Sequence, residues 1–188
     1  MYQNIFKRAI DIILSLSALT LLFPLLALIA IAIYLEDRGK IIFRQKRVGV
    51  NGTTFELLKF RSMPEDTDEF ESAHAHGLAV TRVGRYIRRT NIDELPQLIN
   101  VLRGNMSLVG PRPPLASQVR LCEFRRENGS IGCLPGLTGL AQVNGYDGMP
   151  DEEKARWDGE YAKTMSLFND AKIVLRTFGY LRKNPPVY

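Results

Sequence analysis

Residues 90–104 read Thr-Asn-Ile-Asp-Glu-Leu-Pro-Gln-Leu-Ile-Asn-Val-Leu-Arg-Gly, a stretch that combines two adjacent acids with regularly spaced apolar residues. Its apolar side chains recur at i, i+3, i+4 and i+7, which predicts one short helix with a single apolar face. Asn91 is expected to cap the start of this helix, and Gly104 is expected to close its end. The two acids Asp93 and Glu94 would then lie at the positive end of the helix dipole.

The acid pair directly follows a segment that is rich in arginine. Two carboxylates among cations at a helix start are suited to chemistry on a phosphate group. Acids also occur at helix starts simply because they complement the dipole, so this segment alone leaves both interpretations open. The arginines are Arg85, Arg88 and Arg89.

Composition limits the classes of function. The 188 residues suffice for one domain with a hydrophobic core, and the net charge of +5 indicates an anionic partner. The basic residues form no single block, so we expect no nucleic acid partner. Cys122 and Cys133 lack CxxC spacing, and His74 and His76 lie in a polar stretch. A disulfide framework or a zinc site is therefore not indicated.

Residues 12–35 carry no charged side chain, and this run is long enough to enter a membrane. A cleaved signal peptide fits poorly, because the run is too long and no small-residue cleavage site follows it. Pro24 lies in the middle, where it would kink or break a helix, and basic residues flank both ends. These features favour a re-entrant helix broken at Pro24, and a single kinked span is the alternative.

The turn dipeptide Asn51-Gly52 predicts a small β-hairpin with strands at 41–48 and 53–63. Residues 64–79 are acidic and polar, and they predict a loop or a weak helix. Further helices, several of them amphipathic, are predicted over residues 78–90, 117–128, 150–166 and 167–183. The aromatic and basic side chains of the last two suit a membrane interface, although core packing accounts for the aromatics equally well.

Three other segments carry candidate phosphate or nucleotide contacts. Lys59 and Arg61 share one face of the second predicted strand, where they would bind a phosphate or simply face solvent. Arg112 lies in the rigid Gly-Pro-Arg-Pro-Pro turn at 110–114, and its planar fork suits phosphate. Residues 135–145 predict a loop shaped for close backbone approach. The chain has no GxGxxG and no Walker A motif, so a Rossmann or P-loop site is not indicated.

Five motifs, taken in order, resemble those of the bacterial monotopic phosphoglycosyl transferases, which load a sugar-1-phosphate onto a polyprenol phosphate carrier. Each motif is weak alone, but five in family order over nearly the whole chain are specific. The chain departs from many small members at the helix break, where it has Phe23-Pro24 in place of Ser-Pro. Its length resembles the minimal catalytic form. The motifs are Lys7-Arg8-x-x-Asp11, Lys59-Phe60-Arg61-Ser62-Met63, Asp93-Glu94-Leu95-Pro96-Gln97-Leu98, Gly110-Pro111-Arg112-Pro113 and residues 135–145.

The resemblance implies a two-step mechanism. Asp93 would attack the β-phosphate of a UDP-sugar and release UMP, and polyprenol phosphate would then take the sugar-1-phosphate from Asp93. It also implies Mg²⁺, with Glu94 as the carboxylate ligand, and a place on the cytoplasmic face of the bacterial plasma membrane. The implied substrate contacts are Lys59, Arg88, Pro111 and Arg112 at the phosphates, and Gln142 and Asn144 at the nucleotide or sugar.

The expected fold is α+β and mostly helical. A membrane-inserted helix at 1–38 would precede a cytosolic catalytic domain at 39–188, in which interfacial helices surround a compact site. The sequence leaves the carried sugar and the glycan pathway open, and it is compatible with a homodimer.

Two other functions compete with the transferase. A membrane-bound phosphatase that forms an aspartyl-phosphate would use water as its acceptor. A membrane-anchored scaffold that binds anionic lipid would be unaffected by Asp93→Asn except in its surface charge. The cations that converge on one carboxylate pair disfavour the scaffold.

Overall fold

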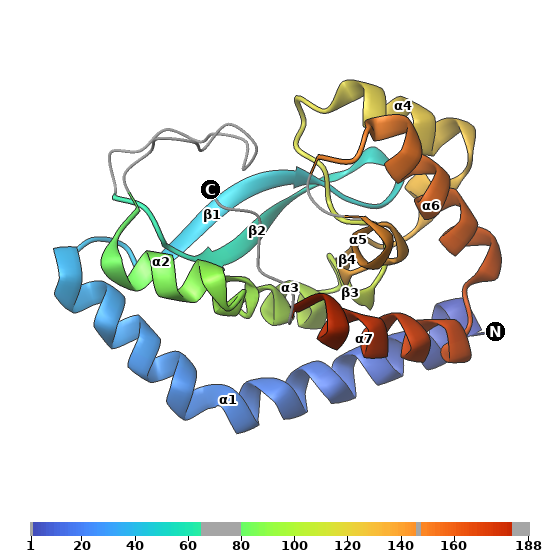
Figure 1. Cartoon of the computed structure of the whole chain (residues 1–188). Helices are drawn as coiled ribbons and strands as arrows, with labels where there is room; N and C mark the ends of the chain where they lie inside the picture. Colours follow the sequence, from blue (N-terminus) through green and yellow to red (C-terminus); the bar gives the residue numbers. More distant parts are fainter. Residues whose placement is uncertain (1, 65–79, 146–147, 182–188) are drawn as a thin grey trace.

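The computed structural model describes residues 2–64, 80–145 and 148–181 (Figure 1). This part of the chain is mostly helical, as predicted, and it includes two small sheets. The predicted acidic segment at 64–79 lies almost entirely outside the described residues.

The longest element is helix α1, Lys7–Asp37, which follows a short π-helical turn at Tyr2–Phe6. Pro24 lies inside α1, and the axis of the helix bends about halfway along its length (Figure 1). Its length and composition would allow it to cross a membrane. Many of its apolar side chains are exposed, with Leu21 reaching 80%. The re-entrant path of this helix stays a prediction.

The predicted hairpin is confirmed. Strand β1, Ile42–Val48, pairs antiparallel with β2, Thr54–Phe60. Between the strands lies a 3₁₀ turn at Val50–Gly52, in which Asn51 has φ 54° and Gly52 has φ 81°. Asn and Gly tolerate this left-handed conformation better than other residues do, which is why this dipeptide marks the turn.

The prediction of one helix over 90–104 is wrong at its start. The acids lie in a separate 3₁₀ turn, Ile92–Glu94, and helix α3 runs only over Gln97–Arg103. Asn91 has φ 54° and makes no side-chain cap, so it turns the chain instead of starting an α-helix. Pro96 lacks the N–H that a continuous helix would need there. Gly104, at φ 87°, closes α3 as predicted.

The C-terminal half contains a second, parallel sheet that the sequence did not predict. In this sheet Ser107 pairs with Gly136, and Val109 pairs with Thr138. Residues 135–145 are therefore a strand followed by a short helix, where the sequence predicted a loop. Strands of three residues are too short to reveal an alternating pattern. The elements are β3 (Ser107–Val109), α4 (Val119–Glu127), a 3₁₀ turn (Ser130–Gly132), β4 (Gly136–Thr138), α5 (Leu140–Asn144), α6 (Asp151–Thr164) and α7 (Leu167–Leu181).

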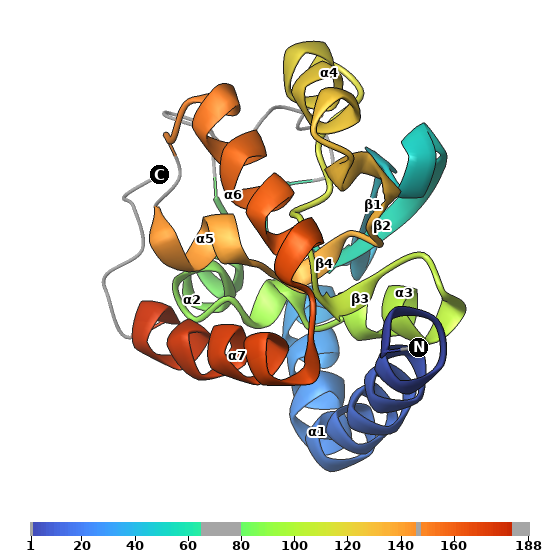
Figure 2. The same ribbon diagram turned by 90° about the vertical axis from the view of Figure 1, so that its right-hand side faces the viewer.

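Helix α2, Arg82–Arg89, lies between α1 and the hairpin (Figure 1). Figure 2 shows α7 on one side of the molecule and the hairpin on the other. Three buried apolar clusters hold the helices and strands together, since burial of apolar side chains stabilises the fold. They are Ile29, Ile33, Phe60 and Ile87 between α1, β2 and α2; Val109, Leu140, Tyr161 and Ile173 among β3, α5, α6 and α7; and Leu57, Val101 and Met106 between β2 and α3.

The first motif of the chain attaches the start of α1 to the other elements. Lys7 Nζ lies 2.6 Å from Asp170 Oδ2 of α7, and both side chains are buried. Arg8 donates to two main-chain carbonyls at the end of α3. Asp11 accepts the amide of Leu108 in β3 at 3.0 Å. The Lys-Arg-x-x-Asp pattern is therefore a set of contacts to three different elements.

We expect Lys7→Met to lower the free energy of unfolding by about 3 kcal/mol or more, because it leaves the Asp170 charge buried without its cation. Chemical unfolding in detergent micelles would measure the loss. The matched control is Lys154→Met, whose pair with Asp151 spans 3.7 Å and is partly exposed. That pair should contribute less than about 1 kcal/mol. Equal losses in the two variants would contradict this account.

Candidate active site

Glu94 is the charged centre of the site. Its Oε1 accepts hydrogen bonds from Lys59 Nζ at 2.7 Å and from Arg112 Nη2 at 2.9 Å. Burial alone would raise the pKa of Glu94, but Arg112 and Lys59 outweigh burial and hold that pKa below its usual range. Glu94 is therefore ionised throughout the physiological range.

Asp93 has a pKa that is shifted in the opposite direction to that of Glu94. Its exposed fraction is 7%, and burial is the largest effect on its pKa, which rises to about 6. The negative charge of Glu94 adds to this rise, whereas Lys59, Arg88 and Arg112 oppose it. Asp93 is thus more basic than an ordinary aspartate, yet it is largely ionised above neutral pH.

The three cations come from three separate elements. Lys59 lies near the end of β2, Arg88 lies in the last turn of α2, and Arg112 lies in the proline-rich turn after β3. Close backbone packing sets the position of α2 against the end of β2. A Cβ at Gly84 would overlap the carbonyl oxygen of Ser62, so only glycine permits this approach. The glycine thereby places the arginine-bearing helix beside the strand that carries Lys59.

The structure therefore brings together five of the residues predicted for the site: Asp93, Glu94, Lys59, Arg88 and Arg112. Arg61 behaves differently from its neighbour Lys59. It forms an ion pair with Asp37 at the end of α1, so it fastens this apolar helix to the end of the hairpin.

Pro111 has a structural role in the site. Its carbonyl accepts the amide of Gly136 at 2.9 Å, which links the proline-rich turn to β4. A Cβ at Gly136 would overlap the backbone of Gly110, so this contact requires glycine. The motif at 110–113 and the start of the motif at 135–145 are thus packed backbone to backbone.

The side chains of Gln142 and Asn144 in α5 both contact other protein groups. Gln142 Nε2 lies 3.5 Å from the carbonyl of Leu137, and Asn144 Oδ1 accepts Arg176 Nη2 of α7 at 2.6 Å. The side-chain Oε1 of Gln142 is buried and has no protein partner among the described residues. Their role at a nucleotide or sugar stays a prediction.

The donor set fits the usual way in which enzymes hold Mg²⁺ on a phosphate substrate. That ion takes one or two carboxylates and completes its shell with phosphate oxygens and water. Asp93 and Glu94 are adjacent carboxylates of this kind, although Glu94 is shared with Lys59 and Arg112. In the described part of the chain, no group of three or more acidic, histidine or cysteine side chains is placed to hold a metal. A metal here would therefore depend on substrate oxygens.

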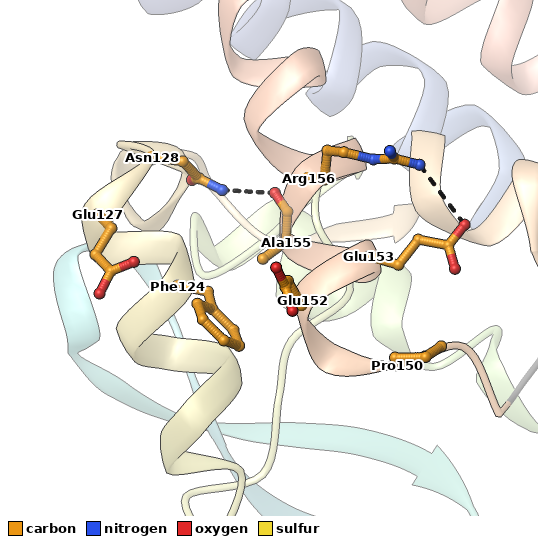
Figure 3. A pocket seen from close by; sticks show the side chains of 8 residues that line it. All are labelled: Phe124, Glu127, Asn128, Pro150, Glu152, Glu153, Ala155 and Arg156. Atoms are coloured by element: carbon orange, nitrogen blue, oxygen red, sulfur yellow. Dashed lines mark hydrogen bonds and ion pairs between the residues drawn. The ribbon is translucent and has the colours of Figure 1, made fainter.

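A separate groove lies between α4 and α6 (Figure 3). Phe124, Asn128 and Pro150 are among the residues that line it, and Asn128 Nδ2 donates to the carbonyl of Ala155 at 2.6 Å. None of the predicted site residues lines this groove, so it is distinct from the acid pair.

Comparison with known proteins agrees with the motifs. The chain matches the model of the bacterial sugar transferase family over residues 2–184. It is 44% identical to a UDP-glucose:undecaprenyl-phosphate glucose-1-phosphate transferase of Caulobacter vibrioides, over 91% of this chain and 67% of that protein. A protein of the same name from Escherichia coli is 40% identical, over 96% of this chain and 41% of its own length.

A third relative is the exopolysaccharide production protein ExoY of Sinorhizobium fredii. It is 35% identical over 93% of this chain and 84% of that protein. The chain thus spans most of some relatives and less than half of others. The family model covers nearly every residue, and the chain therefore belongs to the bacterial sugar transferase family.

Proposed function

We propose that this protein transfers a sugar-1-phosphate from a UDP-sugar to polyprenol phosphate and releases UMP, as a membrane step of bacterial glycoconjugate assembly. The observation that carries the proposal is a buried carboxylate, Asp93, beside an ionised Glu94 and within the field of three cations. The donor and acceptor named for the Caulobacter and Escherichia relatives support the substrate class.

In the first step, an Asp93 oxygen attacks the β-phosphorus of the UDP-sugar. A new oxygen–phosphorus bond forms, the bond to the bridging oxygen breaks, and UMP leaves with that electron pair. The carboxylate needs no base above its pKa of about 6, and its burial makes it more nucleophilic than a hydrated aspartate. The product is a covalent sugar-phosphate ester of Asp93, which is an acyl phosphate.

In the second step, a phosphate oxygen of polyprenol phosphate attacks the same phosphorus. The bond to Asp93 breaks, the carboxylate is restored, and the sugar leaves on a polyprenyl diphosphate. Both steps bring anions together, so neutralisation of charge is the main catalytic task. Lys59, Arg88 and Arg112 are the cations that would bind the phosphate oxygens.

We assign Glu94 two roles. It orients Lys59 and Arg112 through the bonds at 2.7 and 2.9 Å. It would also be the carboxylate ligand of Mg²⁺, which when bound supplies further neutralisation of the diphosphate oxygens.

The covalent step is tested by the mass of the intact protein. After mixing with Mg²⁺ and a panel of UDP-sugars, without lipid acceptor, we expect a sugar-phosphate adduct on the wild type. Asp93→Asn should lack the adduct, because the amide is not a competent nucleophile. The matched control is Asp151→Asn at the start of α6, which should retain the adduct.

The outcomes separate the competing reactions. Release of sugar phosphate into water without polyprenol phosphate would favour the phosphatase. If no donor gives an adduct and UMP release requires polyprenol phosphate, the two-step route is wrong. The lipid phosphate would then attack the UDP-sugar directly.

The pH dependence of UMP release tests the state of Asp93. Protonation below a pKa of about 6 removes the nucleophile, so the single-turnover rate should fall about tenfold per pH unit below that value. Above it the rate should level off. The depressed pKa of Glu94 predicts no second acid limb between pH 5 and 8. A flat profile across pH 6 would contradict the assignment of Asp93 as the nucleophile.

We also infer that α1 is re-entrant and leaves both ends on the cytoplasmic side. Contacts at its two ends support this path. Its start binds Asp170 through Lys7, and its end binds the amide of Arg82 in α2 through Glu36 at 2.6 Å. One apolar helix whose ends both contact the same folded body would enter and leave the membrane on one side, with Pro24 near the bend.

Cysteine labelling tests this path. In a chain with Cys122 and Cys133 replaced by serine, Ile5→Cys and Lys40→Cys should both react with an impermeant maleimide from the cytoplasmic side only. A single span would place the two positions on opposite sides, so reaction of one of them from outside would refute the re-entrant path. The chain that carries only the two serine replacements is the labelling control.

A further inference from the structure

Four successive carbonyl groups help to hold the turn that carries Arg112. It contains three prolines, which have no N–H to donate, so at those positions hydrogen bonds can hold the backbone only through carbonyl groups. Each of the four carbonyls from 111 to 114 accepts a bond from a different residue. The donors are the amide of Gly136 to Pro111 (2.9 Å), Arg125 to Arg112 (2.9 Å), Arg47 to Pro113 (3.2 Å) and the amide of Val48 to Pro114 (2.9 Å).

The donor to the Arg112 carbonyl is a buried arginine that belongs to none of the five motifs. Arg125 of α4 is 4% exposed, and its Nη1 donates to the Arg112 carbonyl. Its Nε and Nη2 both donate to Asp158 Oδ2 of α6, at 2.9 and 2.6 Å. Asp158 is only 1% exposed. One planar guanidinium therefore joins α4, α6 and the backbone of a site residue.

We propose that Arg125, held by Asp158, is a positioning residue that fixes the backbone of Arg112 so that its side chain meets Glu94 and the phosphate. This inference rests on the proposed function, and it extends the site by a layer of residues that do not contact the substrate.

Exposure explains why the backbone bond matters. The Arg112 side chain is 38% exposed, so packing around that side chain restrains it only in part. Its placement at 2.9 Å from Glu94 therefore depends on where the main chain directs it. Arg125 acts on that main chain directly.

A purely stabilising role explains the buried pair less well. Exchange of a buried ion pair for apolar side chains of similar size is often neutral or stabilising. The two helices also have a second link that is independent of Arg125, from Asn128 to the carbonyl of Ala155 (Figure 3). The pair can therefore be replaced without removing every contact between α4 and α6.

Two variants separate positioning from folding. Arg125→Met combined with Asp158→Leu removes both charges together, so no unpaired buried charge remains. Arg125→Lys keeps the charge, but its single nitrogen cannot span Asp158 and the Arg112 carbonyl as the planar fork does. The matched control is Arg126→Lys, at the next position of α4, where the side chain is exposed.

We expect both Arg125 variants to lower kcat for UMP release by about 10- to 100-fold, because small displacements of a positioned group have effects of this size. Arg126→Lys should stay within about twofold of the wild type. In an Arg112→Met background, adding Arg125→Lys should change kcat by less than about twofold, since the residue it positions is already missing. A further 10- to 100-fold loss of kcat in that background would overturn the inference.

The guanidinium signal of Arg112 gives a readout that does not depend on turnover. Arg112 Nη2 donates to Glu94 at 2.9 Å, so displacement of the Arg112 backbone should change the environment of this group. We expect the ¹H–¹⁵N guanidinium signal of Arg112, assigned by its loss in Arg112→Met, to shift in Arg125→Lys and to stay unchanged in Arg126→Lys. An unchanged Arg112 signal in Arg125→Lys would overturn the inference.

The Arg112 signal needs no turnover, so it decides the positioning role even if the wild type transfers no sugar phosphate. Absence of turnover in the wild type would then count against the proposed function alone.

Discussion

Two adjacent carboxylates that are largely buried need positive charge close by, and this requirement organises the molecule. Uncompensated, a buried carboxylate would be strongly destabilising. The balancing charges are Lys59, Arg88 and Arg112, and they come from β2, α2 and the turn after β3. The hairpin, the arginine-bearing helix and the proline-rich turn must therefore all converge on the 3₁₀ turn at Ile92–Glu94. Packing features such as the close backbone approach at Gly84 bring these elements to the acid pair, and they thereby place the cations beside the carboxylates.

The same constraint links the site to α1. The end of α1 contacts the elements that supply two of the cations, through Glu36 to the start of α2 and through Asp37 to Arg61, two residues beyond Lys59. Its start contacts α3 and β3, which flank the acid turn and the turn of Arg112. An apolar helix long enough to cross a membrane is thus fastened at both ends to the elements that carry the candidate site residues. This attachment would keep the site close to a lipid-borne phosphate.

The sequence predicted the features whose signals are local. The hairpin followed from Asn51-Gly52, the first helix from its uncharged apolar run, and the later helices from amphipathic patterns. Lys59 and Arg112 lie in motifs in family order, and Arg88 lies in the arginine-rich segment before the acid pair. What it missed depends on contacts between distant residues. The left-handed Asn91 leads into a 3₁₀ turn where the sequence predicted the first turn of an α-helix, and the β3–β4 pair is too short for a periodic signal. Arg125 and Asp158 lie 33 positions apart and neither belongs to a motif, so only the fold reveals their link.

The pKa values of the two acids diverge, and that divergence distinguishes their roles. Glu94 binds Lys59 and Arg112 directly through Oε1, and the resulting low pKa makes its carboxylate a weak nucleophile. Asp93 lies beside it but is governed mainly by burial, so its oxygens retain more basicity. Neighbouring carboxyl groups with environments that separate their pKa values commonly divide a reaction between them. On this reasoning we propose that Glu94 assembles the cations and that Asp93 is the nucleophile. Exchange of the two roles would require moving Lys59 and Arg112, which their own elements hold in place.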